Sequence, residues 1–400
     1  MIEIEEAQGK ILAEVEPLGL ESLPVREAAG RILRENVASE IDLPRFDNSA
    51  MDGYAVQAAD LKPATSERPV PLRLLGQIPA GGAFEGKVSS GTCVRLFTGS
   101  PLPRGADAIV MQEETRVSEV PGVVAFAVPV APWENVRFRG EDIKQGDLLA
   151  AVGDRLHAGQ IAALASVGRS ELRVGIRPRV GLISTGNELR EAGEELGPSQ
   201  IYESNRASLA SLVSAAGGIP VLFPLVRDDL VSVRDSLLAA LNECDAVITS
   251  GGVSVGEWDF VKAAIESAGG RIEFWRVAMK PGKPFVFAKH QGKVIFGLPG
   301  NPVSAFVTFL LLVRPAILVM QGARDWALKV SSGELREPIS NSAERRHFMR
   351  VRIDDQGLVH SAGLQGSHAV SSLARANALL DVPPGTTWPS GQRVRVMPWD

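Results

Sequence analysis

The sequence predicts a multidomain α/β protein whose central element is a doubly wound parallel sheet. Residues 179–279 alternate short apolar runs, such as VGLIST and DAVITS, with helical segments. Strands joined by helices of about 10 to 15 residues form parallel sheets, and ligands bind beyond the carboxyl ends of such strands. The residues before and after this region show short β-type runs separated by proline and glycine, so we expect mostly β domains on either side.

Helical patterns occur near the beginning of the chain and again after the first β-type region. Apolar residues recur at helical spacing over 3–16 and over 24–36, and helical texture returns at 157–166. We therefore expect two helices at the start and a β domain inserted into a helical domain. The expected domains are a helical domain formed by 1–44 and 142–175, an inserted β domain at 45–141, an α/β domain at 176–325 and a small β domain at 326–400.

The composition is that of a globular protein without an obvious polyanionic partner. Of 400 residues, 42 are Lys or Arg, 47 are Asp or Glu and 45% are hydrophobic. This nearly balanced charge offers no broad basic field for nucleic acid, and the apolar content is too high for a disordered chain. Cys93 and Cys244 are too few for a disulfide framework or a four-ligand zinc site. The acidic start MIEIEEAQGK does not resemble a signal peptide, so a cytoplasmic location is expected.

One stretch, residues 303–320, is apolar enough to resemble a membrane span. Arg314 and Pro315 interrupt it near its middle, which leaves apolar runs too short to cross a bilayer. We therefore expect a buried helix and no association with a membrane.

Two familiar motifs are present by letter but lack their structural context. GGAFEGKV at 81–88 resembles a Walker A loop, yet Val88 stands where a magnesium-binding hydroxyl is needed and β-type residues follow where a helix is required. GVSVG at 252–256 fits the nucleophile elbow of serine hydrolases, with Asp259 and His290 following in a suitable order. A second glycine before this motif and carboxylates at its far end make a serine hydrolase the weaker interpretation. The five histidines show no metal-ligand spacing.

The segment TSGGVSVGEWD at 249–259 favours a site for phosphate and a cation. Consecutive glycines at the end of a buried strand let backbone N–H groups point at an anion, and Glu257 and Asp259 could help to hold a divalent cation. The alternative is that the glycines only form the turn and Glu257 only caps the next helix.

Two further loops follow predicted strands. In MKPGKPFVF, Lys280 and Lys283 lie on a turn stiffened by proline, which suits a compact dianion because little ordering entropy is lost on binding. The alternative is a solvated turn. GLPGNPVSAF places a glycine-rich turn before a helix that begins near Asn301 and Pro302.

Several carboxylates lie in segments without helix or strand periodicity. FDNSAMDGYAV contains Asp47 and Asp52, which could hold a cation or act as acid and base, although an Asx turn is the simpler alternative. Glu188 follows a predicted strand and is expected to face the ligand crevice. Asp142 and Asp228 lie in RGED and VRDD.

Taken in chain order, these motifs closely resemble those of the molybdopterin molybdenumtransferase family, which is related to the E domain of gephyrin. The matching segments are FDNSAMDGYAV, LFTGSPLP, RGEDI, STGNEL, QIYESNR, VRDD, SGGVSVGEWDF, KPGKP, GLPGNPVSA and QGSH. The resemblance covers the chain from its start to its end. It implies a homodimer whose subunits contain a two-segment helical domain, an inserted β domain, a molybdopterin-binding α/β domain and a C-terminal β barrel.

The resemblance also implies the reaction in which adenylylated molybdopterin and molybdate give molybdenum cofactor and AMP, with magnesium as the divalent cation. The active site is implied to lie between the α/β domain of one subunit and the N-terminal region of the other. The further partners that the resemblance suggests are an adenylyltransferase and acceptor molybdoenzymes.

The resemblance assigns site residues in three groups. The catalytic positions are Asp52, Thr98, Asp142, Glu188, Asp228 and Asp259, of which Asp52, Glu188, Asp228 and Asp259 are the expected metal ligands. The molybdate positions are Lys280, Lys283, Arg350 and Ser367. The other substrate-binding positions are Ser250, Gly251, Gly252, Ser254, Pro299, Gly300, Asn301 and Pro302. Many family members have an acidic residue where this chain has Asn187, which is therefore not expected to bind metal.

Two other functions compete with this interpretation. A molybdopterin adenylyltransferase would share the α/β domain but would not need the N-terminal and barrel domains. A gephyrin-like scaffold without turnover would not need an intact set of acidic and basic site residues. This chain has both the additional domains and the intact set of site residues, which favours the molybdenumtransferase.

Overall fold

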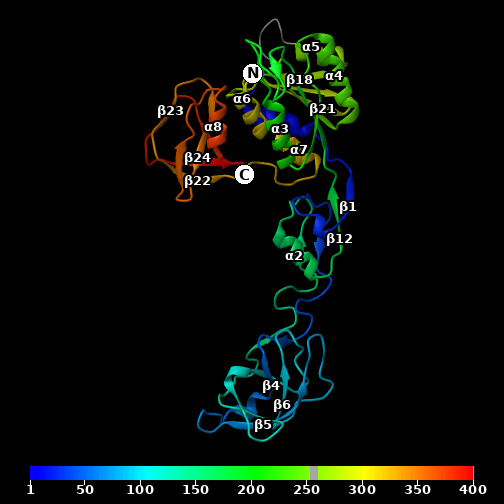
Figure 1. Ribbon diagram of the computed structural model, residues 1–400, viewed down its shortest axis with the longest axis vertical. Helices are drawn as coiled ribbons and strands as arrows, with labels where there is room; N and C mark the ends of the chain where they lie inside the picture. Colours follow the sequence, from blue (N-terminus) through cyan, green and yellow to red (C-terminus); the bar gives the residue numbers. More distant parts are fainter. Residues whose placement is uncertain (253–259, 400) are drawn as a thin grey trace. The chain divides into compact units, whose positions relative to one another are not determined.

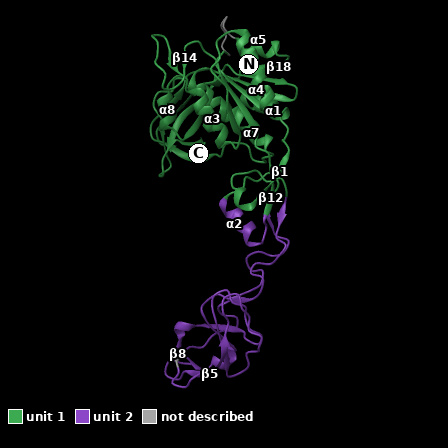
Figure 2. Ribbon diagram, turned by 45° about the vertical axis from the view of Figure 1, so that its right-hand side comes forward, with its two compact units in different colours: residues 1–35, 151–157, 171–400 green, residues 36–150, 158–170 purple. Residues whose placement is uncertain are grey.

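The computed structural model describes residues 1–252 and 260–399, which form two compact units (Figure 1, Figure 2). The larger unit comprises residues 1–35, 151–157 and 171–400, and the smaller unit comprises residues 36–150 and 158–170.

A six-stranded sheet forms the centre of the larger unit. Its order is β16-β13-β17-β21-β20-β18, and the strands span Ile219–Leu222, Arg179–Ser184, Ala246–Ser250, Lys293–Leu298, Val286–His290 and Arg271–Trp275. The first four strands are parallel, as predicted. The last two are antiparallel to their neighbours, which the sequence pattern did not predict.

The antiparallel edge arises because a two-residue turn, rather than a helix, joins β20 to β21. Gln291 and Gly292 have φ angles of 48° and 82°, and His290 pairs with Lys293 across the turn. Positive φ at both central residues is the geometry that such hairpin turns require. The sheet is therefore mixed, with its parallel part intact.

Helices cover both faces of this sheet (Figure 1). Helices α1 (Ile4–Ala13) and α3 (Asn205–Ala215) pack on one face, and α4 (Leu230–Glu243) and α5 (Phe260–Ser267) pack on the other. Successive strand residues alternate between the two cores, so that Ile248 joins the first core and Val247 the second.

The apolar stretch near residue 310 is a core helix, which confirms the sequence-based prediction. It runs as α6 (Pro302–Thr308), a π-helical turn η4 (Phe309–Val313) and α7 (Arg314–Met320). Its length and composition would allow it to cross a membrane, but 83% of its apolar window is buried inside the protein. Arg314 is satisfied locally, because its Nη1 donates to the Trp326 carbonyl at 2.8 Å.

Of the two helices predicted at the start, only the first exists, as α1. Residues 24–36 instead contain the end of β1 (Leu20–Pro24), one 3₁₀ turn η1 (Val25–Glu27) and irregular chain, with Gly30 at a φ of 78°. Val25, Ala28, Ile32 and Leu33 of this segment are buried, and Leu33 bridges to Val174 in β12 (Glu171–Gly175), the antiparallel partner of β1. The helical spacing correctly indicated buried positions, but it did not predict the backbone conformation of this segment.

The C-terminal segment forms a closed, barrel-like sheet, as the resemblance implies. Strands β24, β25, β22, β28 and β26 pair in that order, and β26 pairs again with β24. They span Arg346–Ile353, Leu358–Ser361, Ser331–Leu335, Arg393–Pro398 and Ala378–Val382; the short strands β23 (Ile339–Asn341) and β27 (Thr386–Trp388) form a separate pair, and helix α8 covers Val370–Arg375.

A short strand from the α/β region, β19 (Met279–Lys280), extends the barrel sheet. It pairs in parallel with β24 and places Lys280 beside His347. This pairing holds the KPGKP loop, residues 280–284, against the barrel.

The smaller unit is mostly β, as predicted. Its main sheet has the order β7-β4-β6-β5-β9-β8, spanning Ala108–Met111, Gly53–Val56, Thr92–Leu96, Val70–Gln77, Val123–Phe126 and Thr115–Val117. Two short pairs join β2 (Val37–Ala38) to β11 (Leu148–Ala150) and β3 (Asn48–Ser49) to β10 (Val136–Arg137). Helix α2 (Ala158–Ser166) is the helix expected at 157–166, and a strand rather than a helix follows the GGAFEGKV turn.

The pairing of β19 with β24 creates a testable dependence of stability on pH. His347 is only 4% exposed. Burial, together with the nearby cations Lys280, Arg350 and Arg345, lowers the pKa of His347 from 6.5 to about 4. Below pH 6.5 the unfolded chain therefore binds a proton that the folded protein rejects, so the free energy of unfolding falls as the pH drops from about 6.5 to about 4.

We expect His347→Gln to remove this component. Between pH 7 and pH 4.5 the variant should lose less stability than the wild type by about 2 kcal/mol, since one pKa unit corresponds to about 1.4 kcal/mol. Urea titrations at the two pH values measure the difference. Identical losses in the two proteins would show that His347 is not held neutral.

Candidate functional site

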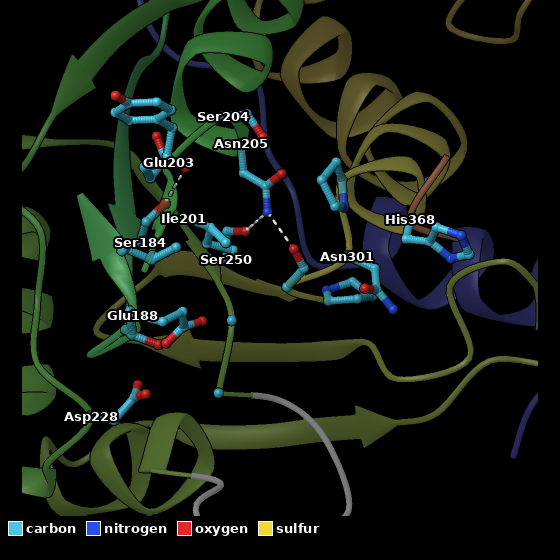
Figure 3. A pocket seen from close by; sticks show the side chains of 18 of the residues that line it. Ser184, Glu188, Ile201, Glu203, Ser204, Asn205, Asp228, Ser250, Asn301 and His368 are labelled. Atoms are coloured by element: carbon cyan, nitrogen blue, oxygen red, sulfur yellow. Dashed lines mark hydrogen bonds between the residues drawn. The ribbon is translucent and has the colours of Figure 1, made fainter. Parts of the chain in front are cut away.

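A pocket lies at the carboxyl ends of the parallel strands (Figure 3). It has a volume of about 650 Å³ and is lined by the ends of β13, β17 and β21, including Ser184, Ser250 and Pro299. We call it the strand-end pocket. Its position is the one predicted for ligands of a doubly wound sheet.

The turn after β17 is built for close packing. Gly251 has a φ of 95°, and a Cβ atom there would lie 2.6 Å from the Thr185 carbonyl oxygen. Its N–H donates to the Leu298 carbonyl at 3.2 Å. Gly251 therefore lines the pocket, but its N–H holds the end of β21 instead of facing a phosphate.

Asn205, the first residue of α3, ties two strand ends together. Its Nδ2 donates to Ser250 Oγ at 2.6 Å and to the Gly300 carbonyl at 2.8 Å (Figure 3). On the neighbouring strand β13, where Ser184 pairs with Ser250, Ser184 donates to Glu203 at 3.0 Å, and the Arg206 backbone N–H donates to the same carboxylate at 2.8 Å. These bonds order the pocket before any ligand binds.

Glu188 and Asp228 supply carboxylates to one side of the strand-end pocket. Figure 3 shows both on the side away from Asn301 and His368. The neighbouring Asp229 has a different role, since its side chain caps α4 by accepting from the Ser232 N–H at 2.8 Å. Asn187 lies outside this pocket, and its Oδ1 accepts from the Asp228 N–H at 3.4 Å.

The donor set suits magnesium bound together with a phosphate. Within residues 1–252 and 260–399, no group of three or more His, Cys, Asp or Glu side chains is placed to hold a metal by itself. Magnesium usually takes one or two carboxylates and fills its remaining positions with substrate phosphate and water. Glu188 and Asp228 fit that pattern. The predicted positions Ser254 and Asp259 lie outside the described residues.

A second pocket, of about 510 Å³, adjoins the first. Lys280, Lys283 and Arg345 line it, so we call it the lysine pocket. No carboxylate is found among the described residues of its lining, which also includes Ser304, Gln365, Gly366 and Ser367. The two pockets share Pro284, Pro299 and Asn301. Three converging cations and hydroxyl groups suit a small dianion.

The predicted position Arg350 lies outside this lining. It is fully buried, and its guanidinium donates to the carbonyls of Leu364 and Gly366, both at 3.1 Å, and to Ser372 Oγ at 3.2 Å. Burial lowers the pKa of Arg350 to about 10. This placement indicates that Arg350 supports the loop that carries Ser367 and does not contact a ligand directly.

Arg345 supplies the guanidinium that the lysine pocket contains. Its Nη1 donates to the Met279 carbonyl at 2.7 Å, which anchors the side chain beside Lys280. Sequence reasoning missed this residue because Arg345, Arg346 and Arg350 stand in one basic run, whose spacing does not show which side chain turns inward. Sequence reasoning also missed Asn205 and Gln365. The signal that could have found them is a polar residue next to a motif at the end of a strand.

Asp52, Thr98 and Asp142 belong to the smaller unit. The structure brings the first two together, because the Thr98 N–H and hydroxyl both donate to Asp52 Oδ1 at 2.8 Å. These two bonds hold the pKa of Asp52 below its ordinary value. A carboxylate stabilised in its charged form is a weak base, so Asp52 suits a cation better than a proton-transfer step. Asp142 is separate from this pair, and its N–H donates to the Leu43 carbonyl at 3.1 Å.

Three family models match the chain in succession. They are the MoeA N-terminal region (domain I and II) at residues 2–168, a probable molybdopterin binding domain at 181–318, and the MoeA C-terminal region (domain IV) at 332–399.

Curated relatives and solved structures agree with these models. A molybdopterin molybdenumtransferase of Haemophilus influenzae is 38% identical over 386 residues, covering 95% of this chain and 94% of the relative. Molybdopterin molybdenumtransferase 2 of Mycobacterium tuberculosis is 40% identical over 370 residues, covering 90% of each chain. The solved molybdopterin biosynthesis MoeA protein of Pyrococcus horikoshii has a TM-score of 0.85 at 31% identity, with both chains covered completely. The chain therefore belongs to the molybdopterin molybdenumtransferase family, and like these relatives it is an enzyme of molybdenum cofactor biosynthesis.

Proposed function

We propose that this enzyme uses adenylylated molybdopterin and molybdate as substrates and releases molybdenum cofactor and AMP in the cytoplasm. The observation that carries the proposal is the shared wall between two chemically different pockets. The strand-end pocket contains the carboxylates of Glu188, Glu203 and Asp228, and the lysine pocket contains three cations. A nucleotide-linked pterin and an oxyanion would thus bind side by side.

In this proposal the strand-end pocket holds adenylylated molybdopterin. Glu188 and Asp228 would hold magnesium, which neutralises the negative charge that develops on phosphate as AMP leaves. Asn205 keeps the loops after β17 and β21 at a fixed separation. The loops therefore need little reorganisation when the substrate binds.

The lysine pocket holds molybdate in this proposal. Lys280, Lys283 and Arg345 offset the two negative charges, and the Ser367 hydroxyl offers a hydrogen bond. Neighbouring cations repel one another, so a dianion is the ligand that relieves the most unfavourable electrostatics here.

The lysine pocket also separates this proposal from its two competitors. Its lining includes Arg345, Gln365 and Ser367, which come from the C-terminal region that a lone adenylyltransferase domain would lack. A scaffold without turnover would have no need for an intact pocket of this kind.

We further propose a homodimer in which Asp52 and Thr98 of one subunit complete the site formed by Glu188 and Asp228 of the other. The support is the division of acidic site residues between two units of the chain and the weakly basic character of Asp52. The adenylyltransferase that makes the substrate and the acceptor molybdoenzymes would be transient partners.

Lys283→Ala tests the assignment of the lysine pocket. We expect the molybdate concentration for half-maximal AMP release to rise roughly ten-fold or more, because a charge-assisted hydrogen bond contributes about 1.5 to 3 kcal/mol. The affinity for adenylylated molybdopterin should change by only a few-fold, since that ligand spreads its contacts over many atoms. Lys329→Ala, at an exposed position outside both pockets, is the matched control. A collapse of nucleotide affinity with an unchanged molybdate response would move Lys283 to the phosphate.

Subunit mixing tests the shared site. Asp52→Asn and Glu188→Gln should each stop AMP release, because each removes one carboxylate from every site of its homodimer. Mixed subunits should regain part of the activity, since a hybrid dimer contains one site with both carboxylates. If subunit exchange is demonstrated by mass spectrometry and activity stays absent, each site is formed within one chain.

A further inference from the structure

Asn301 stands at the start of helix α6 without capping it. Asparagine is among the preferred residues at this position, because its side chain normally accepts from a backbone N–H two or three residues later. The Asn301 side chain makes no such bond. It donates instead through Nδ2 to Ser367 Oγ at 3.0 Å.

The bond between Asn301 and Ser367 lies at the boundary of the two pockets. Asn301 lines both, whereas Pro302 lines only the strand-end pocket and Ser304 only the lysine pocket. The opposite side of the boundary shows the same division, because Ser367 lines the lysine pocket and His368 the strand-end pocket. Asn301 thus connects α6 to the loop that carries Ser367.

This contact limits the directions in which the Ser367 hydroxyl proton can point. A serine hydroxyl has one proton to donate and two lone pairs that accept. One lone pair receives the Asn301 N–H, so the proton must point elsewhere. The Ser367 carbonyl accepts from the Val303 N–H at 3.2 Å, which holds the backbone of the loop in place. The remaining direction for the hydroxyl proton includes the lysine pocket.

We propose that Asn301 is a positioning residue that orients the Ser367 hydroxyl proton toward the oxyanion in the lysine pocket. The inference rests on the proposed function, in which that oxyanion is molybdate. Asn301 acts through Ser367, so its contribution to anion binding disappears when the serine hydroxyl is removed.

A double-mutant cycle measured with molybdate alone tests the proposal. Isothermal titration calorimetry gives the dissociation constant for the wild type, Asn301→Ala, Ser367→Ala and the double variant. We expect Ser367→Ala to weaken molybdate binding about ten-fold, as for one hydrogen bond to a charged ligand, and Asn301→Ala to weaken it several-fold. The double variant should bind no more weakly than Ser367→Ala, because both changes remove the same interaction.

Thermal unfolding distinguishes positioning from helix capping. Asn301→Ala should leave the unfolding midpoint nearly unchanged, since no cap bond is lost. Asn301→Asp, which retains a good capping side chain, should weaken molybdate binding more than Asn301→Ala does. Its carboxylate would accept the Ser367 proton and turn it away from the anion. In the Ser367→Ala background this additional effect should shrink to what the added negative charge causes.

Two results would overturn the inference while leaving the proposed function intact. One is simple multiplication of the two single effects in the double variant. The other is a lower unfolding midpoint for Asn301→Ala with unchanged molybdate affinity. If the wild type binds no molybdate and releases no AMP, the proposed function fails as well.

Discussion

The parallel pairing of β19 with β24 is the contact on which the proposed chemistry depends. It joins two residues of the α/β region, Met279 and Lys280, to the first two residues of β24 in the barrel. The pairing holds the KPGKP loop next to the barrel, the part of the chain that carries Ser367. The shared apolar core fixes the joint further, because Phe348 and Leu379 of the barrel pack into the same cluster as Phe285 and Phe296 of the sheet. The lysine pocket therefore depends on the contact between the α/β region and the C-terminal barrel.

Gathering cations at this joint has an electrostatic cost that shapes the surrounding residues. His347 pairs with Lys280 across β24 and β19 and is kept neutral, while Arg346, next to it in sequence, pairs with Glu5 and Asp381. Arg350 is buried and satisfies loop carbonyls. Only part of the basic run therefore contributes charge to the pocket, and a dianion would offset that charge.

The sequence predicted the parallel strands, the buried helix at residues 303–320 and the β character of both flanking regions, because periodicity and turn residues are local signals. It did not predict the hairpin edge, since the short turn at Gln291–Gly292 was not recognised between two apolar runs. At the site, strand-end loops indicated Glu188, Lys280 and Lys283, and the resemblance indicated Asp228; all four line the two pockets. The separation of Arg345 from Arg350 was not predictable, because it depends on pairing between β19 and β24, which are distant in sequence.

The most direct test of this account is a crystal structure of the protein soaked in molybdate, with anomalous data collected at the molybdenum absorption edge. We predict one strong anomalous peak within hydrogen-bonding reach of Lys280, Lys283 and Ser367, with Asn301 still bonded to the serine. An anomalous peak beside Glu188 and Asp228, with the lysine pocket empty, would contradict the assignment of the two pockets.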